Sequence, residues 1–389
     1  MNYSKKFKSI ILSSIVTIFF LRNNIYSLTW PIPENFPGRE SITGTFGEYR
    51  DATRTHEGID IGVSYQPIIA PESGEITAKG EQSGGAGYWL EINHYYKFYH
   101  LFNDKYYEDA YVGMPVIEGQ RIATSGESGS AKGRPHLHFG MGDENPLLYF
   151  DISDTKDGLI VKVYFRHDGQ LLELTDGMVF NKSNLFPASG EFIVNAYDKS
   201  NVGNKVNFYK ITCILNGKEL KTWEFNVSHS NEASEVYSID NPASSRDDYY
   251  YRMGTWRSAE GKHTLEIRGY DLNNTSLRLS ATKTINFIID TTPPEIKLHH
   301  PPKVIFVSKS QWPAGGYKSP ISYPVKISFD VEDNIAVDDV YLYVDGRFVS
   351  SWENLETDIF LSTTTICGWE KHSLKIMAID LAGNTTEHS

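Results

Sequence analysis

Hydrophobic and polar residues alternate over short segments of this chain, and no long segment repeats with the helical period of about 3.6 residues. In the first part of the chain, glycine-rich turns at residues 83–87 and 125–129 separate such segments. The strands predicted there span residues 74–78, 88–94, 97–101, 120–124 and 136–141. Short runs rich in Val, Ile, Thr and Tyr continue to the end of the chain between Asn-Gly and Asp-Gly turns. The pattern predicts a mainly β protein.

The second part of the chain contains an internal repeat. Near residue 151 the glycine loops become rare and longer alternating strands begin. Residues 192–223 match residues 327–352, and each copy passes through an Asn-Gly or Asp-Gly turn to a tryptophan. Each copy then closes with a similar strand, at residues 262–271 and 371–380. Two tandem β-sandwiches of the immunoglobulin-like type are the simplest interpretation.

The segment between the two copies contains Pro293 and Pro294. Proline fixes its own φ and restricts the preceding residue, so this segment is predicted to be a stiff linker. We therefore expect a first domain, a first sandwich and a second sandwich, at residues 28–151, 152–291 and 292–389.

The amino terminus has the features of a secretory signal peptide. Lys5, Lys6 and Lys8 precede an apolar run at residues 10–21, and Ser27 is a small residue suited to a cleavage site. The run is shorter than the roughly 20 residues that a membrane-spanning helix needs, so an uncleaved anchor is the weaker alternative. We expect residues 1–27 to be removed, leaving no membrane span in a mature chain exported to the periplasm, the cell envelope or the outside.

Charge and cysteine content narrow the class of protein. The 389 residues carry a formal net charge of −12, which argues against a nucleic-acid partner because phosphate binding needs a basic face. The two cysteines, Cys213 and Cys367, lie far apart in the repeats. Two buried thiols are the favoured interpretation, although an exported protein could join them in a disulfide.

Two short histidine motifs supply the donors of a metal site. His56 and Asp60 lie four residues apart, and His136 and His138 flank Leu137. Residues two apart on a strand face the same side, so His136 and His138 should enter one cleft while Leu137 enters the core. Imidazole nitrogens and a carboxylate suit zinc, and two histidines beside Asp60 would leave one position open for water.

The same place offers the beginning of a helical zinc motif. His56-Glu57 could begin an HExxH helix, but the fifth residue is Asp60 rather than histidine. Gly58 would also cost about 1 kcal/mol relative to alanine inside a helix. A strand-built site is therefore preferred.

These motifs, taken together, resemble the lysostaphin/LytM type of zinc metallopeptidase, a family of peptidoglycan endopeptidases with the duplicated hybrid motif fold. The resemblance covers most of residues 30–150 and rests on several segments in the family's order: Gly44-Thr-Phe46-Gly47, His56 to Asp60, Tyr99-His100-Leu101, Gly113-Met-Pro-Val116, Glu118-Gly119-Gln120 and His136 to Phe139. It implies an antiparallel β-sheet peptidase domain, followed here by bacterial immunoglobulin-like domains. The chain departs from the family at Gly140, where an acidic residue is common, and in a longer, more basic loop at residues 129–134.

The resemblance also assigns roles to individual residues. It makes His56, Asp60 and His138 the ligands of one Zn2+ per chain, with His100 and His136 as the catalytic pair beside it. Which of the two is the general base stays open. The implied substrate is a peptide stem or cross-bridge of peptidoglycan, and the implied reaction is its hydrolysis by zinc-activated water.

Two other functions remain possible on the sequence. A non-catalytic relative could activate other cell-wall hydrolases, although such proteins usually lose metal ligands. Alternatively, the immunoglobulin-like repeats could make this a surface or adhesion protein that binds an envelope partner.

Several other residues were considered as sites. The Asp and Asn clusters at residues 270–274 and 379–384 could hold calcium but are more often plain turns. The tyrosines of residues 249–251 could form a sugar or partner platform or pack along an edge strand. His94, at the end of a predicted strand, is expected to pack against that strand rather than enter a cleft.

Overall fold

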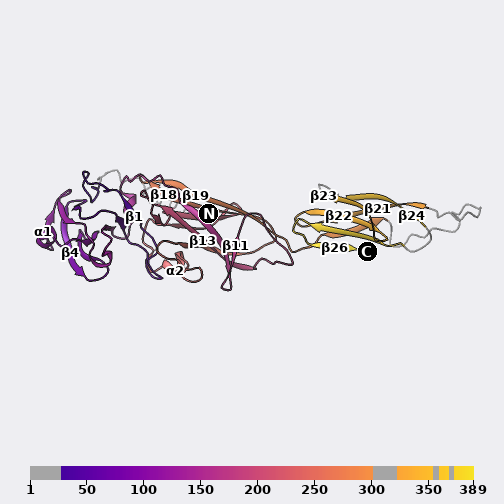
Figure 1. The fold of residues 1–389 in the computed structure, drawn as a ribbon, viewed down its shortest axis with the longest axis horizontal. Helices are drawn as coiled ribbons and strands as arrows, with labels where there is room; N and C mark the ends of the chain where they lie inside the picture. Colours follow the sequence, from indigo (N-terminus) through magenta and orange to yellow (C-terminus); the bar gives the residue numbers. More distant parts are fainter. Residues whose placement is uncertain (1–27, 301–321, 354–358, 368–371) are drawn as a thin grey trace, which may run out of the picture.

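The computed structural model describes residues 28–300, 322–353, 359–367 and 372–389. The predicted signal peptide lies outside these residues. Figure 1 shows three β-rich sections in a row, from the amino-terminal section in indigo to the carboxy-terminal section in yellow. Among the described residues, no helix is both long enough and apolar enough to cross a membrane.

The amino-terminal section is built on a seven-stranded antiparallel sheet with the order β1-β2-β9-β6-β5-β4-β7. A second ladder pairs β3 with β8. The elements are β1 (Ile42–Gly44), β2 (Ile59–Ile61), β3 (Pro67–Ile69), β4 (Gly74–Gln82), β5 (Gly87–Ile92), β6 (Tyr96–Leu101), α1 (Lys105–Asp109), β7 (Pro115–Val116), β8 (Arg121–Thr124), η1 (Gly129–Ala131), β9 (Leu137–Met141) and η2 (Pro146–Leu148). The five strands predicted for this section are therefore present, with ends shifted by a few residues.

The middle section is a β-sandwich. One sheet has the order β11-β10-β13-β14, with β17 also paired to β13, and the other has the order β12-β19-β18-β15-β16. The elements are β10 (Leu159–His167), β11 (Gln170–Leu174), β12 (Met178–Phe180), β13 (Ser189–Lys199), β14 (Lys205–Val206), β15 (Lys210–Leu215), β16 (Lys218–Glu224), α2 (Ala233–Val236), β17 (Tyr250–Arg257), β18 (Gly261–Asn273) and β19 (Ser276–Ile289). We call this section sandwich 1.

The last section, sandwich 2, repeats the main strand order of sandwich 1. Its sheets are β20-β21-β24 and β23-β22-β25-β26, which correspond to β10-β13-β17 and β16-β15-β18-β19. The strands are β20 (Glu295–His300), β21 (Ser322–Glu332), β22 (Val337–Val344), β23 (Arg347–Glu353), β24 (Ile359–Cys367), β25 (Leu374–Asp380) and β26 (Thr385–His388). The repeat seen in the sequence is thus a repeat of strand topology.

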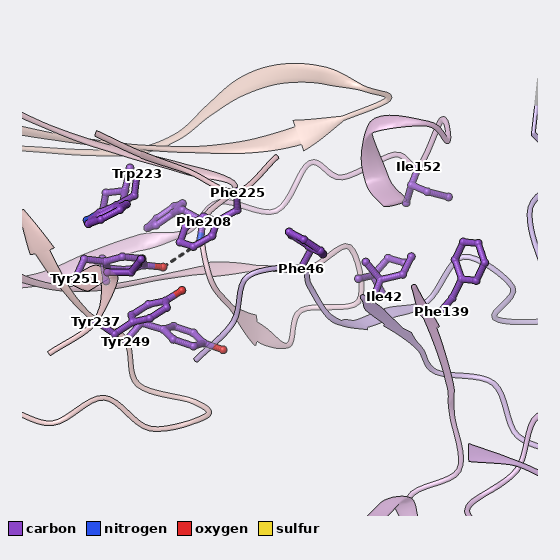
Figure 2. Packing of buried hydrophobic residues seen from close by; sticks show 14 of the residues in the cluster. Ile42, Phe46, Phe139, Ile152, Phe208, Trp223, Phe225, Tyr237, Tyr249 and Tyr251 are labelled. Carbon is purple, nitrogen blue, oxygen red and sulfur yellow. Dashed lines mark hydrogen bonds between the residues drawn. The ribbon is translucent and has the colours of Figure 1, made fainter. Parts of the chain in front are cut away.

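One hydrophobic core joins the amino-terminal section to sandwich 1, while sandwich 2 has a separate core. In Figure 2, Phe46 lies between Ile42 of the amino-terminal sheet and Phe208 and Phe225 of sandwich 1. All four of these side chains are buried. Because burying a side chain of this size contributes about 1.5–3 kcal/mol, the two sections stabilise each other.

Residues 225–249, between β16 and β17, bind sandwich 1 to the amino-terminal section. The hydroxyl of Tyr237 donates to the Gly47 carbonyl at 2.8 Å, and the side-chain amide of Asn145 donates to the Phe225 carbonyl at 2.9 Å. Gly47 has φ +88°, and a Cβ built there would lie 2.2 Å from the Phe225 ring. Sandwich 2 has only the five residues 354–358 between the equivalent strands β23 and β24, so this contact segment belongs to sandwich 1.

Side-chain exposure bears on three further predictions from the sequence, those for the tyrosine run, for His94 and for the two cysteines. Tyr249 and Tyr251 are fully buried, so the tyrosine run is not an exposed platform. Among the described strands β17 pairs only with β13, so Tyr251 packs inward from an edge strand, as the second alternative expected. His94 was expected to pack against its strand, but it lies in a turn with φ +53° and its side chain is 80% exposed. Cys213 is a buried free thiol, whereas the side chain of Cys367 lies outside the described residues.

Candidate metal centre

Three side-chain atoms converge in the amino-terminal section. His56 Nε2 lies 2.9 Å from His138 Nδ1, and each of these nitrogens lies 3.1 Å from Asp60 Oδ1. In a tetrahedral site with metal–ligand bonds of about 2.0–2.1 Å, ligand atoms lie roughly 3.3 Å apart. The near-equilateral triangle therefore fits three ligands of one zinc ion in both donor type and spacing.

The central sheet places two of these ligands opposite each other. Asp60 on β2 pairs with His138 on β9, and Gly44 on β1 pairs with Asp60 from the other side. A Cβ at Gly44 would lie 2.7 Å from Asp60 Oδ2, and one at Gly58 would lie 2.7 Å from His138 Nε2. Because they have no side chain, Gly44 and Gly58 leave room for the Asp60 carboxylate and the His138 imidazole to approach each other.

Hydrogen bonds and burial set the protonation of the three groups. His56 Nδ1 lies 2.8 Å from the Thr45 carbonyl, so Nδ1–H donates there and Nε2 keeps its lone pair for a metal. Burial lowers the pKa of His138 to about 4, which keeps that ring neutral at neutral pH. Burial alone would raise the pKa of Asp60, but the His56 and His138 rings outweigh it and hold that pKa well below its usual range.

His100 and His136 lie beside this triangle. Their ring centroids are 4.7 Å apart, and His136 Nε2 is 3.7 Å from Asp60 Oδ1. Each Nδ1–H donates to a backbone carbonyl, at 3.0 Å to Ser128 for His100 and at 2.8 Å to Arg134 for His136. Each ring therefore keeps a lone pair on Nε2, and burial lowers the pKa of His100 to about 4.

The backbone at His100 explains how this residue reaches the cleft. Strict alternation along β6 would put His100 on the core face with Tyr96 and Phe98, which are both buried. His100 instead has φ +63°, a left-handed conformation that is uncommon for a residue with a side chain. As a result both Tyr99 and His100 line the cleft, and the Tyr99 ring stacks on His138 at 4.9 Å between centroids.

The structure adds two residues that the sequence analysis missed. Arg50 donates to Glu48 Oε2 at 2.8 Å and to Asp60 Oδ2 at 3.4 Å. The second oxygen of buried Glu48 accepts from the Thr45 amide at 2.7 Å. Arg50 therefore holds the oxygen of Asp60 that is not directed at the triangle, and Glu48 holds Arg50. The only sign of these residues in the local sequence is that acidic Glu48 and basic Arg50 stand two positions apart, shortly before the His56 motif.

The five site residues predicted from the sequence all line one cleft with a volume of ≈ 720 Å³. His136 directly precedes β9, rather than lying within the strand, yet it shares the cleft with His138 as expected, and Leu137 is fully buried. Part of the wall comes from sandwich 1, through residues Asn204, Lys205, Arg246 and Asp247. Basic side chains are prominent around the cleft, namely those of Arg50, Arg54, Lys97, Arg134, Lys205 and Arg246.

Comparison with known proteins matches this part of the chain to a peptidase family. Residues 54–148, which contain both histidine motifs, match Peptidase family M23. A protein from Haemophilus influenzae described as an uncharacterized metalloprotease is 33% identical over 108 residues. The match covers 28% of this chain and 21% of that protein, so the chain spans about a fifth of that relative's length.

Solved structures resemble the chain only weakly. The fibronectin(III)-like modules of Clostridium thermocellum CbhA match 58% of this chain and 90% of theirs, with 13% identity and a TM-score of 0.22. The match to the D1–D4 ectodomain fragment of ICAM-5 covers 66% of this chain and 63% of the ICAM-5 fragment, with 12% identity and a TM-score of 0.29. At TM-scores this low, neither likeness indicates a function.

Proposed function

Because residues 54–148 match Peptidase family M23, we propose that the protein is an exported, zinc-dependent endopeptidase that hydrolyses peptide cross-links of bacterial peptidoglycan. The observation that carries the proposal is the triangle of His56 Nε2, Asp60 Oδ1 and His138 Nδ1, with edges of 2.9 to 3.1 Å. A non-catalytic role is disfavoured because all three donors are present and converge.

The three donors would hold the metal through two neutral imidazoles and one carboxylate. When bound, zinc lowers the pKa of a coordinated water from about 15.7 to about 7 and polarises a carbonyl. Arg50 keeps Asp60 in place through its other oxygen, at 3.4 Å. Such support of a ligand by its neighbours fixes the ligand's orientation.

His100 and His136 would handle protons and charge beside the metal. Each donates Nδ1–H to a carbonyl, so each offers Nε2 either to take a proton from the attacking water or, once protonated, to stabilise the developing oxyanion. A pKa of about 4 for His100 means that this ring is neutral in the resting site at neutral pH. The same ring can then return a proton to the leaving amine.

The cleft suits an extended and partly acidic peptide. It is open to solvent between the amino-terminal section and sandwich 1, and its basic residues can pair with the carboxylates of peptidoglycan stems. Sandwich 1 supplies Lys205 and Arg246, so it forms part of the substrate site rather than a detached spacer.

Digestion of purified cell walls tests the proposal. Walls with direct D-alanyl–diaminopimelyl cross-links and walls with pentaglycine bridges would be incubated with the zinc-loaded protein, and the fragments identified by mass spectrometry. New amino and carboxyl ends at one peptide bond are expected. His136→Ala should slow cleavage by roughly 10²- to 10⁴-fold, and His94→Ala, which changes an exposed histidine outside the cleft, should leave it unchanged. Absence of new peptide ends from every wall type would refute the proposed substrate.

A further inference from the structure

Three aspartates meet where sandwich 1 ends and sandwich 2 begins, far from the zinc site. Asp290 follows β19 of sandwich 1, whereas Asp333 follows β21 and Asp380 ends β25 of sandwich 2. One carboxylate oxygen of each residue lies within 4.8 Å of the corresponding oxygens of the other two. The cluster therefore spans both sandwiches.

Two oxygens in this cluster are buried without a partner. Asp290 is fully buried, and its Oδ1 accepts from the Thr292 amide at 3.2 Å while its Oδ2 has no hydrogen bond. Asp333 Oδ2 accepts from the amides of Ile335 and Ala336 at 2.7 and 2.9 Å, while its Oδ1 is buried and unpaired. Burying unpaired carboxylates is costly unless a cation compensates them.

The nearest charges add to this cost. Asp333 and Asp380 both act on Asp290 with like charge, and burial together with these charges raises the Asp290 pKa. Burial likewise raises the pKa of Asp380, with Asp333 as a further like charge. The three groups thus repel one another in the folded protein.

Sandwich 1 has aspartates at the matching positions, and one of them is paired with an arginine. In the sequence repeat, Asp198 stands at the position of Asp333, and Asp271 stands at the position of Asp380. Asp154 lies near both Asp198 and Asp271. There Arg278, opposite Asp271 in the β18–β19 hairpin, donates from Nε to both oxygens of Asp271 at 3.1 Å. A fixed guanidinium therefore supplies a positive charge beside Asp271.

Sandwich 2 lacks this arginine. In the β25–β26 hairpin the residue opposite Asp380 is Asn384, whose backbone carbonyl accepts from the Asp380 amide at 3.1 Å. The Asn384 side chain donates to Asp380 Oδ2 at 2.9 Å and to the Asp290 carbonyl at 2.8 Å, but it carries no charge. Among the described residues, Asp380 therefore has no arginine opposite it to compensate the three carboxylates.

We propose that Asp290, Asp333 and Asp380 bind a calcium ion that fixes sandwich 2 to sandwich 1. All the donors are oxygens, and calcium takes several carboxylate oxygens together with carbonyls and water in an adaptable geometry. A set made of oxygens alone suits zinc less well, because zinc favours sites that include nitrogen or sulfur donors. Because Asp290 belongs to one sandwich and the other two aspartates to the next, bound calcium restricts the angle between them.

Calorimetric titration of the zinc-loaded, full mature chain with CaCl2 tests this assignment. One calcium per chain is expected, with a dissociation constant of about 1 mM or lower, the range of extracellular calcium modules. Asp333→Asn keeps an oxygen for the Ile335 and Ala336 amides but removes the charge, and it should weaken binding at least about tenfold. Asp338→Asn, an aspartate on β22 outside the cluster, is the matched control and should bind as the wild type does.

Thermal unfolding of the same proteins provides a second readout that also reports whether each variant is folded. Calcium should raise the unfolding temperature of the wild type and of Asp338→Asn, and it should raise that of folded Asp333→Asn much less. The proposal is overturned if calcium does not bind, if Asp333→Asn binds it as tightly as the wild type, or if Mg2+ binds as tightly as Ca2+. The zinc-loaded peptidase site serves as an internal reference, because its metal content should be equal in all three proteins.

Discussion

Gly58→Ala should disrupt the metal centre without changing any ligand. Gly58 lies between two of the proposed ligands, His56 and Asp60, and its φ is not in the left-handed region, so alanine is compatible with the backbone. The added Cβ would lie 2.7 Å from His138 Nε2 and 2.7 Å from the Phe139 carbonyl oxygen. One of these neighbours is a ligand and the other is the backbone of the strand that carries it.

The size of the effect follows from these distances. Ordinary contacts of a Cβ begin near 3.4 Å, so the His138 ring or β9 must move by about 0.7 Å, the difference between 3.4 and 2.7 Å. Metal–ligand distances tolerate only about 0.2 Å. We expect zinc affinity to fall by at least about 100-fold, equivalent to roughly 2.7 kcal/mol.

Competition with a chromophoric zinc chelator would measure this loss. Gly84→Ala is a matched control, because no atom lies within 4 Å of a Cβ built at Gly84. It should bind zinc like the wild type, and circular dichroism should show that both variants are folded. Unchanged zinc affinity in Gly58→Ala would refute the packing argument for the site.

Three further changes test other parts of the structure. Phe225→Ala removes a buried ring from the core shared by the amino-terminal section and sandwich 1. It should lower the free energy of unfolding by about 3–5 kcal/mol in urea denaturation. A loss below about 1 kcal/mol would contradict the packing of Phe225 in a shared core. Burial raises the pKa of Asp198 to about 8, against 3.8 for an ordinary aspartate, so wild-type stability should fall as the pH rises from about 4 through about 8. Asp198→Asn should show a flatter profile of urea midpoints over that range, and an unaltered slope would argue against a protonated Asp198. Arg246→Ala should raise KM about two- to fivefold with kcat and zinc content unchanged, since an exposed charge contact contributes up to about 1 kcal/mol. Arg257 is exposed and lies outside the cleft, so Arg257→Ala should change neither kinetic constant.

The β architecture and the two histidine motifs were predictable because both depend on local spacing. Alternation of polar and apolar residues marked the strands, and Leu137 is buried between His136 and His138, as a period of two requires. The repeated strand order of the two sandwiches was likewise visible as a sequence repeat.

His100 shows where local spacing fails. Alternation along β6 assigns it to the core face, and only the resemblance to a peptidase family assigned it to the site. Its left-handed φ of +63° turns it into the cleft, and no hydrophobic pattern records such a backbone change.

Other parts of the site depend on contacts between segments that are distant in sequence. Nothing near Glu48 and Arg50 in the sequence indicates that Glu48 is buried or that Arg50 reaches Asp60. The role of residues 225–249 was also unpredictable, since Tyr237 reaches Gly47 across 190 positions. Sandwich 1 therefore has to be kept in any functional study of the peptidase domain.

The decisive measurement for zinc-dependent hydrolysis of peptidoglycan is the rate at which the protein releases new amino groups from purified peptidoglycan, before and after removal of its metal. We expect measurable release by the zinc-loaded protein, loss of that release with a chelator, and recovery on adding about one equivalent of zinc per chain. Equal release from the metal-free protein, or no release from the protein with one zinc bound, would contradict it.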